Sequence, residues 1–358
     1  MRNKYEDKSW CIDDLVIHPH IPSINDILRD IYIEPSIISK KLASKYGYLP
    51  YMVERYIKIL GFKDTVDLLN AFEKPLKPVV RTNTLLIDED TLYERLEQLG
   101  FKLERIKWSR ESYRVISAPK SPSIGATHEY LKGYYYVHRD SASLVPVKLL
   151  MHEFEGDVLD ACAAPGGKAT YIAQILNNKY EVLANDLVLY RLKSLIGHIA
   201  RMRIKNIVVT WSDARKLPIL IDKRYDRVLL DVPCSGEGTI MFDQGRKTRT
   251  SLKDLARIVR REIEILLSGI DMLTKNGVLA YVTCSIAPEE NEYVVAKVLE
   301  MRDDIEIVKP PVKLFDWSPW LKSYLGINFP NEFKYCIRIW PHIHSMIGLT
   351  TCLLRRIK

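Results

Sequence analysis

The sequence predicts an α/β protein in which a Rossmann-like, doubly wound sheet follows a small α+β unit and a helical N-terminal segment. Three observations support this order. From residue 155 onward, short apolar runs alternate with helical patterns, as expected for parallel strands buried on both faces. Between residues 79 and 138, short strand and helix patterns alternate at close intervals. Before residue 72 the apolar spacing is helical.

The N-terminal segment is expected to hold several short helices. Ser23 and Ser36 each precede an apolar-periodic run and are suited to cap a helix. Residues 51–60 continue the helical spacing. The next stretch, EKPLKPVV at 73–80, contains two prolines and is predicted to be a linker. We therefore divide the chain into a helical segment (1–75), an α+β subdomain (76–145) and a sheet domain (146–358).

Both later units have a definite predicted element order. In the α+β subdomain, strands are expected at 79–87, 103–106, 113–118 and 133–139, and helices at 92–101 and 127–133. In the sheet domain, strands are expected at 156–161, 181–186, 206–212, 226–232, 277–284, 305–309, 335–340 and 349–356. Helices are expected at 169–176, 189–201, 252–273 and 289–301. This alternation predicts a parallel, doubly wound sheet.

The composition excludes intrinsic disorder across the chain. Of the 358 residues, 47% are hydrophobic and 27% are charged, which is the balance of a soluble globular protein. The 53 Lys and Arg outnumber the 45 Asp and Glu and give a net charge of +8. This excess is compatible with a polyanionic partner.

The cysteines and the first residues of the chain indicate the cellular compartment. No two of the 6 cysteines form a C-x-x-C pair, and their wide spacing is unlike a disulfide scaffold, so we expect neither a metal site nor a secreted framework. Residues 1–15 are charged without an apolar core, which argues against a signal peptide. No apolar run reaches the ~20 residues that span a membrane. We expect a monomeric cytoplasmic protein that does not bind membranes.

The motif DACAAPGGKAT, Asp160–Thr170, carries the first chemical signal. It follows a predicted strand and opens a predicted helix. Gly166 and Gly167 let the backbone approach a ligand closely, and the helix N-terminus adds its dipole. The motif is not G-x-G-x-x-G, so it does not match the dinucleotide-binding fingerprint.

Three acids stand where successive predicted strands end, namely Asp186, Asp213 and Asp231. The carboxyl ends of parallel strands form the edge at which such folds bind ligands. An acid after the second strand is suited to accept hydrogen bonds from ribose hydroxyls. Any one of these acids alone could equally be a helix cap and not a ligand contact.

Two cysteines follow the fourth and fifth strands of the predicted sheet. Cys234 lies in DVPCSGEGT (231–239) and Cys284 in VTCSIAPEENE (282–292). These strands are neighbours in a doubly wound sheet, so both thiols should face one cleft. A thiolate that adds to carbon 6 of a pyrimidine makes carbon 5 nucleophilic, and an acid that favours protonation of ring nitrogen 3 stabilises the adduct. A second thiol could help the first to leave, and the residues alone leave open which thiol attacks.

These motifs resemble those of the Sun/Fmu family of S-adenosylmethionine-dependent RNA cytosine-5 methyltransferases, of the archaeal tRNA or rRNA type. The resemblance also includes YGYLPYMVERY, RTNTLL, GYYYVHRDSAS and RIWPHIH, and covers residue 46 to the C-terminus. It implies a class I methyltransferase fold preceded by a small RNA-recognition-like subdomain. It also implies methyl transfer to cytosine carbon 5 in tRNA or rRNA through a covalent cysteine–cytosine adduct.

The resemblance assigns roles residue by residue. Cys284 is the attacking thiol, and Cys234 assists release of the product. Asp231 and Lys168 line the cytosine pocket, and both are also placed at the cofactor. The other expected contacts to S-adenosylmethionine are Ala163, Ala164, Pro165, Gly166, Gly167, Asp186, Arg191 and Asp213.

The chain departs from the family pattern at three places. His138 and Arg139 stand where the family usually has a glutamine, and Glu262 stands where many members have another glutamine. The C-terminal run SMIGLTTCLL (345–354) replaces a segment that usually holds an acid, a glycine and two phenylalanines. These changes bear on substrate positioning more than on the chemistry.

Two alternatives belong to different classes of protein. A DNA cytosine methyltransferase shares the Pro-Cys thiol but has a different glycine motif and no second thiol in a TCS context. A non-catalytic RNA-binding protein would keep the fold without turnover, and loss of Cys284 or Asp231 would indicate it; both residues are present. The Lys- and Arg-rich stretches 200–230 and 241–265 favour phosphate contacts with RNA.

Overall fold

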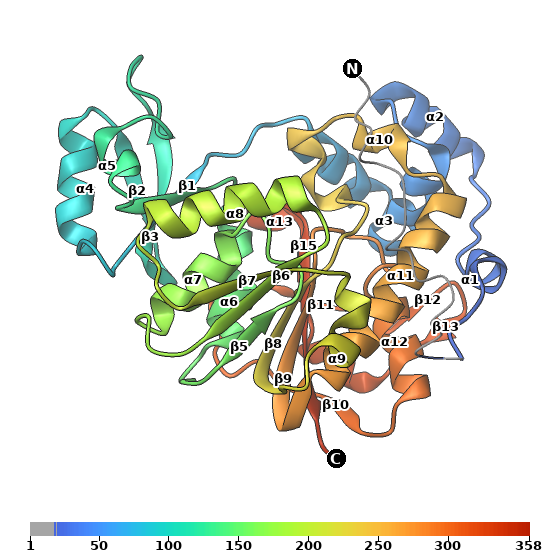
Figure 1. The fold of residues 1–358 in the computed structure, drawn as a ribbon. Helices are drawn as coiled ribbons and strands as arrows, with labels where there is room; N and C mark the ends of the chain where they lie inside the picture. The colour runs from blue at the N-terminus through green and yellow to red at the C-terminus, as the bar shows by residue number, and fades with distance from the viewer. Residues whose placement is uncertain (1–17, 19) are drawn as a thin grey trace, which may run out of the picture.

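The computed structural model describes residue 18 and residues 20–358 of the chain. Within these residues a large sheet forms the centre, a four-stranded sheet lies to one side of it, and the N-terminal helices pack on the other side (Figure 1). The charged segment 1–15, interpreted above as lacking a signal peptide, lies outside the described residues.

Three helices begin the described chain: α1 (Ile24–Asp30), α2 (Ile37–Tyr46) and α3 (Pro50–Phe72). As predicted, the Ser23 and Ser36 hydroxyls cap α1 and α2 by accepting backbone N–H groups of the first turn. Within α3, Gly61 has a non-helical backbone with φ 77°, which interrupts the helix. The positive φ is a conformation that glycine adopts without steric cost.

The N-terminal helices are built into the main hydrophobic core. Ile27 of α1 and Leu68 of α3 belong to the same buried cluster as Leu266 of α11 (Leu252–Asp271) and Val294 of α12 (Glu292–Met301). The N-terminal segment therefore packs directly against helices that cover the central sheet.

The small sheet has the element order β1 (Val79–Thr82), α4 (Glu89–Gln98), β2 (Lys102–Ile106), β3 (Ser109–Ser117), α5 (His128–Leu131) and β4 (Tyr135–His138). Its strand order is β2-β3-β1-β4, and all pairs are antiparallel. β1 is shorter than the predicted 79–87. It ends at Thr82 because the next side chain, Asn83, donates hydrogen bonds to the carbonyls of Gly133 and Met202 and begins a turn.

Five parallel strands form the core of the large sheet: β5 (Val158–Asp160), β6 (Val182–Asp186), β7 (Ile207–Trp211), β8 (Tyr225–Asp231) and β9 (Leu273–Thr283). Their order is β7-β6-β5-β8-β9, so β7 is an edge strand. This arrangement confirms the predicted doubly wound sheet. The parallel prediction is wrong for the final strands, because β15 (Leu349–Arg356) pairs antiparallel with β9.

The sheet continues beyond β9 through short strands. β14 (Ile337–Ile339) pairs with the outer side of β15, and β11 (Ser318–Pro319) pairs with β14, while β10 (Ile305–Ile307) also pairs with β15. A short helix, α13 (Pro341–His344), joins β14 to β15, so the chain reverses direction between neighbouring strands. A two-stranded hairpin, β12 (Ser323–Tyr324) and β13 (Ile327–Asn328), stands apart from this sheet.

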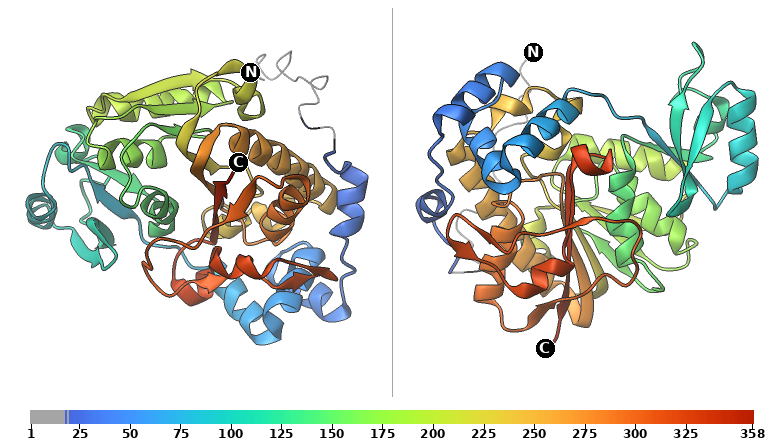
Figure 2. Two further views of the ribbon diagram at one scale, coloured as in Figure 1. Left: turned by 90° about the horizontal axis from the view of Figure 1, so that it is seen from below. Right: turned by 180° about the vertical axis from the view of Figure 1, so that it is seen from behind.

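Helices cover both faces of the large sheet (Figure 2). On one face, α9 (Leu217–Leu220), α11 and α12 share a core with Leu159, Val228 and Leu279. On the other, α6 (Val145–Leu150) and α7 (Gly167–Ile175) share a core with Leu229 and Ala280, and α8 (Leu189–Arg201) packs beside α7. The short helix α10 (Arg246–Arg249) lies between β8 and α11 in the chain.

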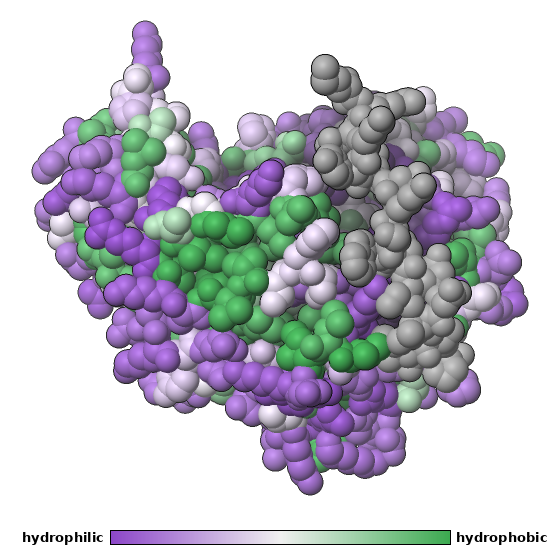
Figure 3. Space-filling view, in the orientation of Figure 1, coloured by the Kyte–Doolittle hydropathy of each residue, from purple (hydrophilic) through white to green (hydrophobic). Residues whose placement is uncertain are grey.

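The outer surface near the edge strand is apolar. Figure 3 shows this area on the face that carries α8 and β7, where Leu189, Val208 and Trp211 are among the exposed large side chains. Among the described residues, no helix combines the length and the hydrophobicity needed to cross a membrane.

A disulfide joins Cys336 and Cys352 across the β14–β15 pair. The wide cysteine spacing gave no sign of it, and the sequence-based expectation of cysteines without a disulfide is wrong for these two. The residues are 16 apart in sequence, and only the antiparallel pairing of β14 with β15 brings their Cα atoms to 4.4 Å.

Replacement of Ser251 by alanine should destabilise the fold through α11. Ser251 and Asp254 form a capping box, in which the Ser251 hydroxyl accepts the Asp254 N–H and the Asp254 carboxylate accepts the Ser251 N–H. Loss of such a cap costs about 1 kcal/mol, whereas Ser251→Gly should cost only a few tenths. Urea denaturation measures both changes. Equal stability of wild type and Ser251→Ala would show that α11 does not depend on this cap.

Candidate functional site

The candidate site lies where β8 and β9 end side by side. Asp231 of β8 is in register with Val282 of β9, so the segments that follow both strands leave the same edge of the sheet. We call residues 232–237 the Cys234 loop and residues 284–291 the Cys284 loop. The Sγ atoms of Cys234 and Cys284 are 3.1 Å apart. The structure thus brings together the two thiols that the sequence placed on neighbouring strands.

The two thiols have opposite pKa shifts. The hydrogen bond with Cys234 lowers the pKa of Cys284 against burial and the charge of Asp231, which both raise it, and Arg246 and Lys168 lower it further. The hydrogen bond to Cys284 raises the pKa of Cys234, and burial and the acids Glu290 and Glu262 add to this. The pKa of Cys284 therefore lies below that of Cys234, so Cys284 loses its proton more readily, and the thiolate is the nucleophilic form of cysteine.

Lys168 and Asp231 form an ion pair beside the thiols. Lys168 lies in the first turn of α7, and its Nζ is 2.6 Å from Oδ2 of Asp231. Burial lowers the pKa of Lys168, but the charge of Asp231 and its hydrogen bond outweigh this effect, so the pKa lies above its ordinary value. The Asp231 side chain stays 32% exposed. It can therefore contact a ligand while it remains paired with Lys168.

Asp160, at the end of β5, is the most unusual acid of the site. Its side chain is fully buried, and neither carboxylate oxygen has a hydrogen-bond partner within the described part of the chain. Burial, followed by the negative charge of Asp231, raises its pKa to about 8. Asp160 is thus largely protonated at neutral pH and can donate a hydrogen bond.

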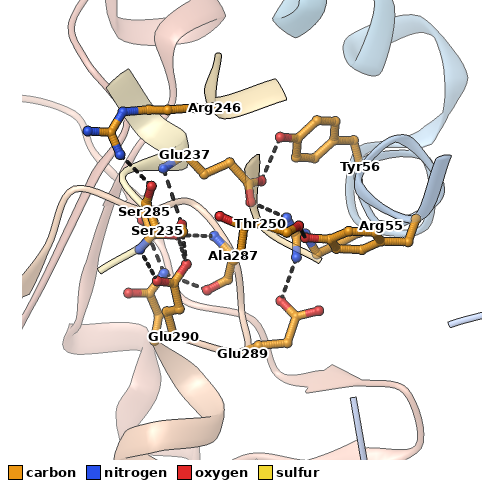
Figure 4. Close-up of polar contacts among 12 residues, drawn as sticks. Arg55, Tyr56, Ser235, Glu237, Arg246, Thr250, Ser285, Ala287, Glu289 and Glu290 are labelled. Carbon is orange, nitrogen blue, oxygen red and sulfur yellow. Dashed lines mark hydrogen bonds and ion pairs between the residues drawn. The ribbon is translucent and has the colours of Figure 1, made fainter. Parts of the chain in front are cut away.

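Glu290 ties the two thiol-bearing loops together (Figure 4). Its Oε1 accepts the Ser235 N–H at 2.6 Å, and its Oε2 accepts the Ser235 hydroxyl at 2.6 Å and the Ser285 hydroxyl. Burial raises the pKa of Glu290 to about 6 against these hydrogen bonds. One carboxylate from the Cys284 loop therefore fixes the residue that follows each thiol.

A close backbone approach joins the C-terminal segment to the same loops. Gly238 donates its N–H to the carbonyl of Cys284 at 2.9 Å, and Gly348 donates to the carbonyl of Gly238 at 2.8 Å. A Cβ on Gly238 would lie 1.9 Å from the Gly348 oxygen. Only glycine fits at this contact, which explains why Gly238 and Gly348 both lack a side chain.

Asp186 organises the loop that precedes α7. Its carboxylate accepts the N–H of Ala164 at 3.0 Å and of Val188 at 2.9 Å, and Arg191 lies 3.5 Å from it. Arg191 also donates to the carbonyl of Ala164. Asp186, Arg191 and the loop Ala163–Gly167 therefore form one connected unit, as the sequence placed them.

Asp213 was assigned to the cofactor, but in the structure its side chain contacts Arg215. Arg215 holds both of its carboxylate oxygens, at 2.6 Å for the closest pair, and the carboxylate also accepts the Arg215 N–H as a helix cap. These contacts satisfy the side chain within its own turn. The assignment of Asp213 to the cofactor stays a prediction.

The three departures from the family pattern lie around this site. His138 is buried against Tyr136, and burial lowers its pKa. Glu262 of α11 is fully buried, and burial together with Glu290 raises its pKa. The segment 345–354 supplies Gly348, so this departure still contacts the Cys234 loop. Arg139 instead lies over the Phe242 ring.

Sequence reasoning missed several residues of the site. Glu290 and Asp160 stand inside motifs quoted above, but neither was assigned a role. The only signal for them was that an acidic residue in a buried loop usually contacts a partner. Arg55, described below, stands inside the quoted run YGYLPYMVERY, but nothing in that run indicated a contact with the site. Within the described ranges, no group of His, Cys, Asp and Glu side chains could hold a metal ion.

Two family models match the chain. The model described as 16S rRNA methyltransferase RsmB/F matches residues 147–355. The model for the N-terminal domain of 16S rRNA methyltransferase RsmF matches residues 49–138. The first match covers more than half of the chain and includes the residues named above other than Arg55, Tyr136, His138 and Arg139.

Curated relatives and a solved structure agree with this match. A mouse 28S rRNA (cytosine-C(5))-methyltransferase is 34% identical over 347 residues, which cover 93% of this chain and 43% of the relative. A ribosomal RNA small subunit methyltransferase F of Aeromonas salmonicida is 30% identical, and the aligned region covers 81% of this chain and 60% of the relative. The chain thus spans less than two thirds of either relative. A methyltransferase homologue from Pyrococcus horikoshii superposes with a TM-score of 0.79 at 30% identity, covering 90% of this chain and 99% of that one.

The protonated state of Asp160 should make stability depend on pH. Its pKa of about 8 in the folded protein exceeds the ordinary 3.8, so the folded state keeps a proton that the unfolded chain releases. The free energy of unfolding should therefore fall by about 1.4 kcal/mol per pH unit between roughly pH 5 and 7 from this group. Asp160→Asn cannot ionise and should remove this slope. Denaturation curves at several pH values measure it, and equal slopes in both proteins would contradict the assignment.

Proposed function

Because the chain belongs to the RsmB/F family of rRNA methyltransferases, we propose that it transfers a methyl group from S-adenosylmethionine to carbon 5 of a cytosine in ribosomal RNA. One observation carries the proposal: two thiols lie 3.1 Å apart beside an acid–lysine pair at the carboxyl edge of the sheet. Carbon 5 of cytosine is a poor nucleophile, and this set of groups is suited to activate it.

Cys284 starts the reaction by attack on carbon 6 of the cytosine. Its pKa is lowered from the ordinary value, which favours the thiolate, and the Cys234 sulfur lies 3.1 Å from it before attack. Formation of the sulfur–carbon bond pushes the electron pair of the 5,6 double bond onto carbon 5. This step turns carbon 5 into the nucleophile that takes the methyl group.

Asp231 stabilises the adduct at ring nitrogen 3. Attack at carbon 6 places negative charge on the ring, and a proton that nitrogen 3 takes from the Lys168–Asp231 pair neutralises it. Lys168, 2.6 Å from Asp231, orients the carboxylate and limits its exposure to water. Both residues act from fixed backbone positions, since one ends β8 and the other begins α7.

Cys234 assists release of the product. Elimination passes the proton of carbon 5 to water, returns the proton of nitrogen 3 to the Lys168–Asp231 pair and restores Cys284 as a thiolate. The Cys234 S–H lies next to this sulfur and hydrogen-bonds to the departing thiolate, which makes it a better leaving group. The raised pKa of Cys234 keeps that proton in place throughout.

The residues after β5 and β6 fit S-adenosylmethionine. When bound, this cofactor supplies an electrophilic methyl group on a sulfonium. Asp186 offers a nearly buried carboxylate suited to ribose hydroxyls, and the buried carboxyl of Asp160, without a partner in the described chain, is suited to a polar end of the cofactor. The backbone of Ala163–Gly167 lies between these two acids and would line the cofactor.

RNA as the substrate is supported by the charges at the site rim. Arg246, Lys247 and Arg249 form the short helix α10, directly after the Cys234 loop and η3 (Glu237–Phe242). Arg246 and Arg249 pair with Asp243 and Lys247 pairs with Glu73, so RNA phosphates would take the place of these acids. The relatives named above are rRNA enzymes. We therefore place rRNA ahead of tRNA as the substrate.

The two cysteine variants should fail in different ways. Cys284→Ala removes the nucleophile, so methyl transfer should fall by several orders of magnitude and no covalent RNA complex should form. Cys234→Ala slows attack, because Cys284 loses its hydrogen bond, but it blocks elimination more strongly. It should accumulate a protein–RNA complex on denaturing gels when unmodified rRNA transcript and S-adenosylmethionine are both present.

The same gel distinguishes the other possibilities. A complex that accumulates in Cys284→Ala and is missing in Cys234→Ala would exchange the two roles. Methyl transfer by both variants without any complex would exclude the covalent mechanism. A tRNA that is methylated while rRNA is not would keep the chemistry and change the substrate.

Asp186→Ala should weaken cofactor binding. The substitution removes a charged acceptor for ribose hydroxyls, and a hydrogen bond to a charged group contributes about 1.5–3 kcal/mol, so affinity should fall roughly tenfold or more. Calorimetry with S-adenosylmethionine measures this. Asp186→Asn, which can still accept the Ala164 N–H, is the control for loop structure. Unchanged affinity in folded Asp186→Ala would show that this acid only holds the loop.

A further inference from the structure

We propose that Arg55 is a positioning residue that holds the Cys234 loop and the Cys284 loop at a fixed separation, an inference whose catalytic meaning rests on the proposed function. Arg55 lies on α3, in the N-terminal helical segment, and its side chain is fully buried. Its Nη1 donates to Oε2 of Glu289 at 3.1 Å, and its Nη2 donates to Oε2 of Glu237. One guanidinium thus bridges both loops (Figure 4).

The two carboxylates lie close to the thiols in sequence. Glu237 is the last residue of the Cys234 loop, and Glu289 lies within the Cys284 loop. Their side chains are 3% and 0% exposed, so water does not compete for the contacts. On the thiol side, Glu290 and Gly238 already link the loops. Arg55 adds a link from the opposite side, so the two loops are held at two separate points.

The chemistry of the cluster favours arginine at this position. A planar guanidinium can donate to two carboxylates at once, whereas a lysine ammonium is a single point charge. Two tyrosines use the remaining oxygens: Tyr56 donates to Glu237 at 2.5 Å, and Tyr324 donates to Glu289 at 3.1 Å. A buried ion cluster persists only when such partners offset the loss of hydration.

The position of the loops sets the position of the thiols. The two sulfur atoms are 3.1 Å apart, and the adduct requires one of them to reach carbon 6 while the other stays in contact. A displacement of about 1 Å in such a constellation can cost about 100-fold in rate. Arg55 itself need not touch the substrate, so its effect should appear in the geometry of the thiol pair.

The test measures thiol geometry and methyl transfer separately. Phenylarsine oxide binds tightly only where two thiols are adjacent, and it needs no RNA. Arg55→Met should bind it at least tenfold more slowly than wild type and should methylate rRNA transcript about 100-fold more slowly, with unchanged affinity for S-adenosylmethionine. Cys234→Ser should abolish arsenical binding, which shows that the probe reports this pair. Arg55→Lys should bind the arsenical and methylate the transcript at rates between those of wild type and Arg55→Met.

The matched control is Arg338→Met. Arg338 is also fully buried and pairs with a buried glutamate, Glu292 at 2.6 Å, but this pair joins β14 to α12 outside both loops. Arg338→Met should bind the arsenical at the wild-type rate. If Arg55→Met does not fold, Glu237→Gln keeps the side-chain shape and replaces the charged acceptor; it should slow arsenical binding about tenfold.

Each result decides the inference. Arsenical binding by Arg55→Met at the rate of Arg338→Met overturns it, and so does lost methyl transfer with intact arsenical binding. If wild type binds the arsenical, Arg55→Met does not, and neither methylates any RNA, the proposed function is refuted while the positioning role of Arg55 is supported.

Discussion

The parallel pairing of β8 with β9 is the constraint on which the site depends. Side chains alternate in direction along a strand, so a shift of one residue in this register would turn Asp231 to the opposite face of the sheet. With Asp231 opposite Val282, the strands end together and the two thiols meet. β5 pairs with the other side of β8, and the α7 that follows it delivers Lys168 to the same acid. Asp231 and Cys234 thus come from the end of β8, Cys284 from the end of β9 and Lys168 from the helix after β5.

Charge is distributed unevenly around the two sulfur atoms. Lys168 and Arg246 act on Cys284, whereas Glu262 and Glu290 act on Cys234. These groups lie largely out of water, where electrostatic interactions are stronger than at the surface. The sequence left open which thiol attacks. Asp231 acts on Cys284 in the opposite sense, and on balance the pKa of Cys284 is lowered while that of Cys234 is raised. The attacking role of Cys284 stays a prediction from the family resemblance.

Much of the fold could be predicted because its signals are local. Buried strands appear as short apolar runs, caps such as Ser23 stand beside the helices they begin, and the edge at which Cys234 and Cys284 gather follows from chain order in a doubly wound sheet. The direction of β15 could not be predicted, because an apolar run has no direction. The contacts of Arg55 could not be predicted either, although it stands in the quoted run YGYLPYMVERY, because its partners lie more than 180 residues further along the chain.

The contact between Gly348 and Gly238 has a consequence for the timing of activity during protein synthesis. β15 follows every other strand in the chain, yet it lies inside the sheet against β9, and Gly348 just before it supports the Cys234 loop. A nascent chain that ends before residue 348 lacks both supports, even though all four groups proposed to act on cytosine have already been synthesised. The contacts that β15 gives to β9 and that Gly348 gives to Gly238 are therefore the last supports of the site to be completed during synthesis.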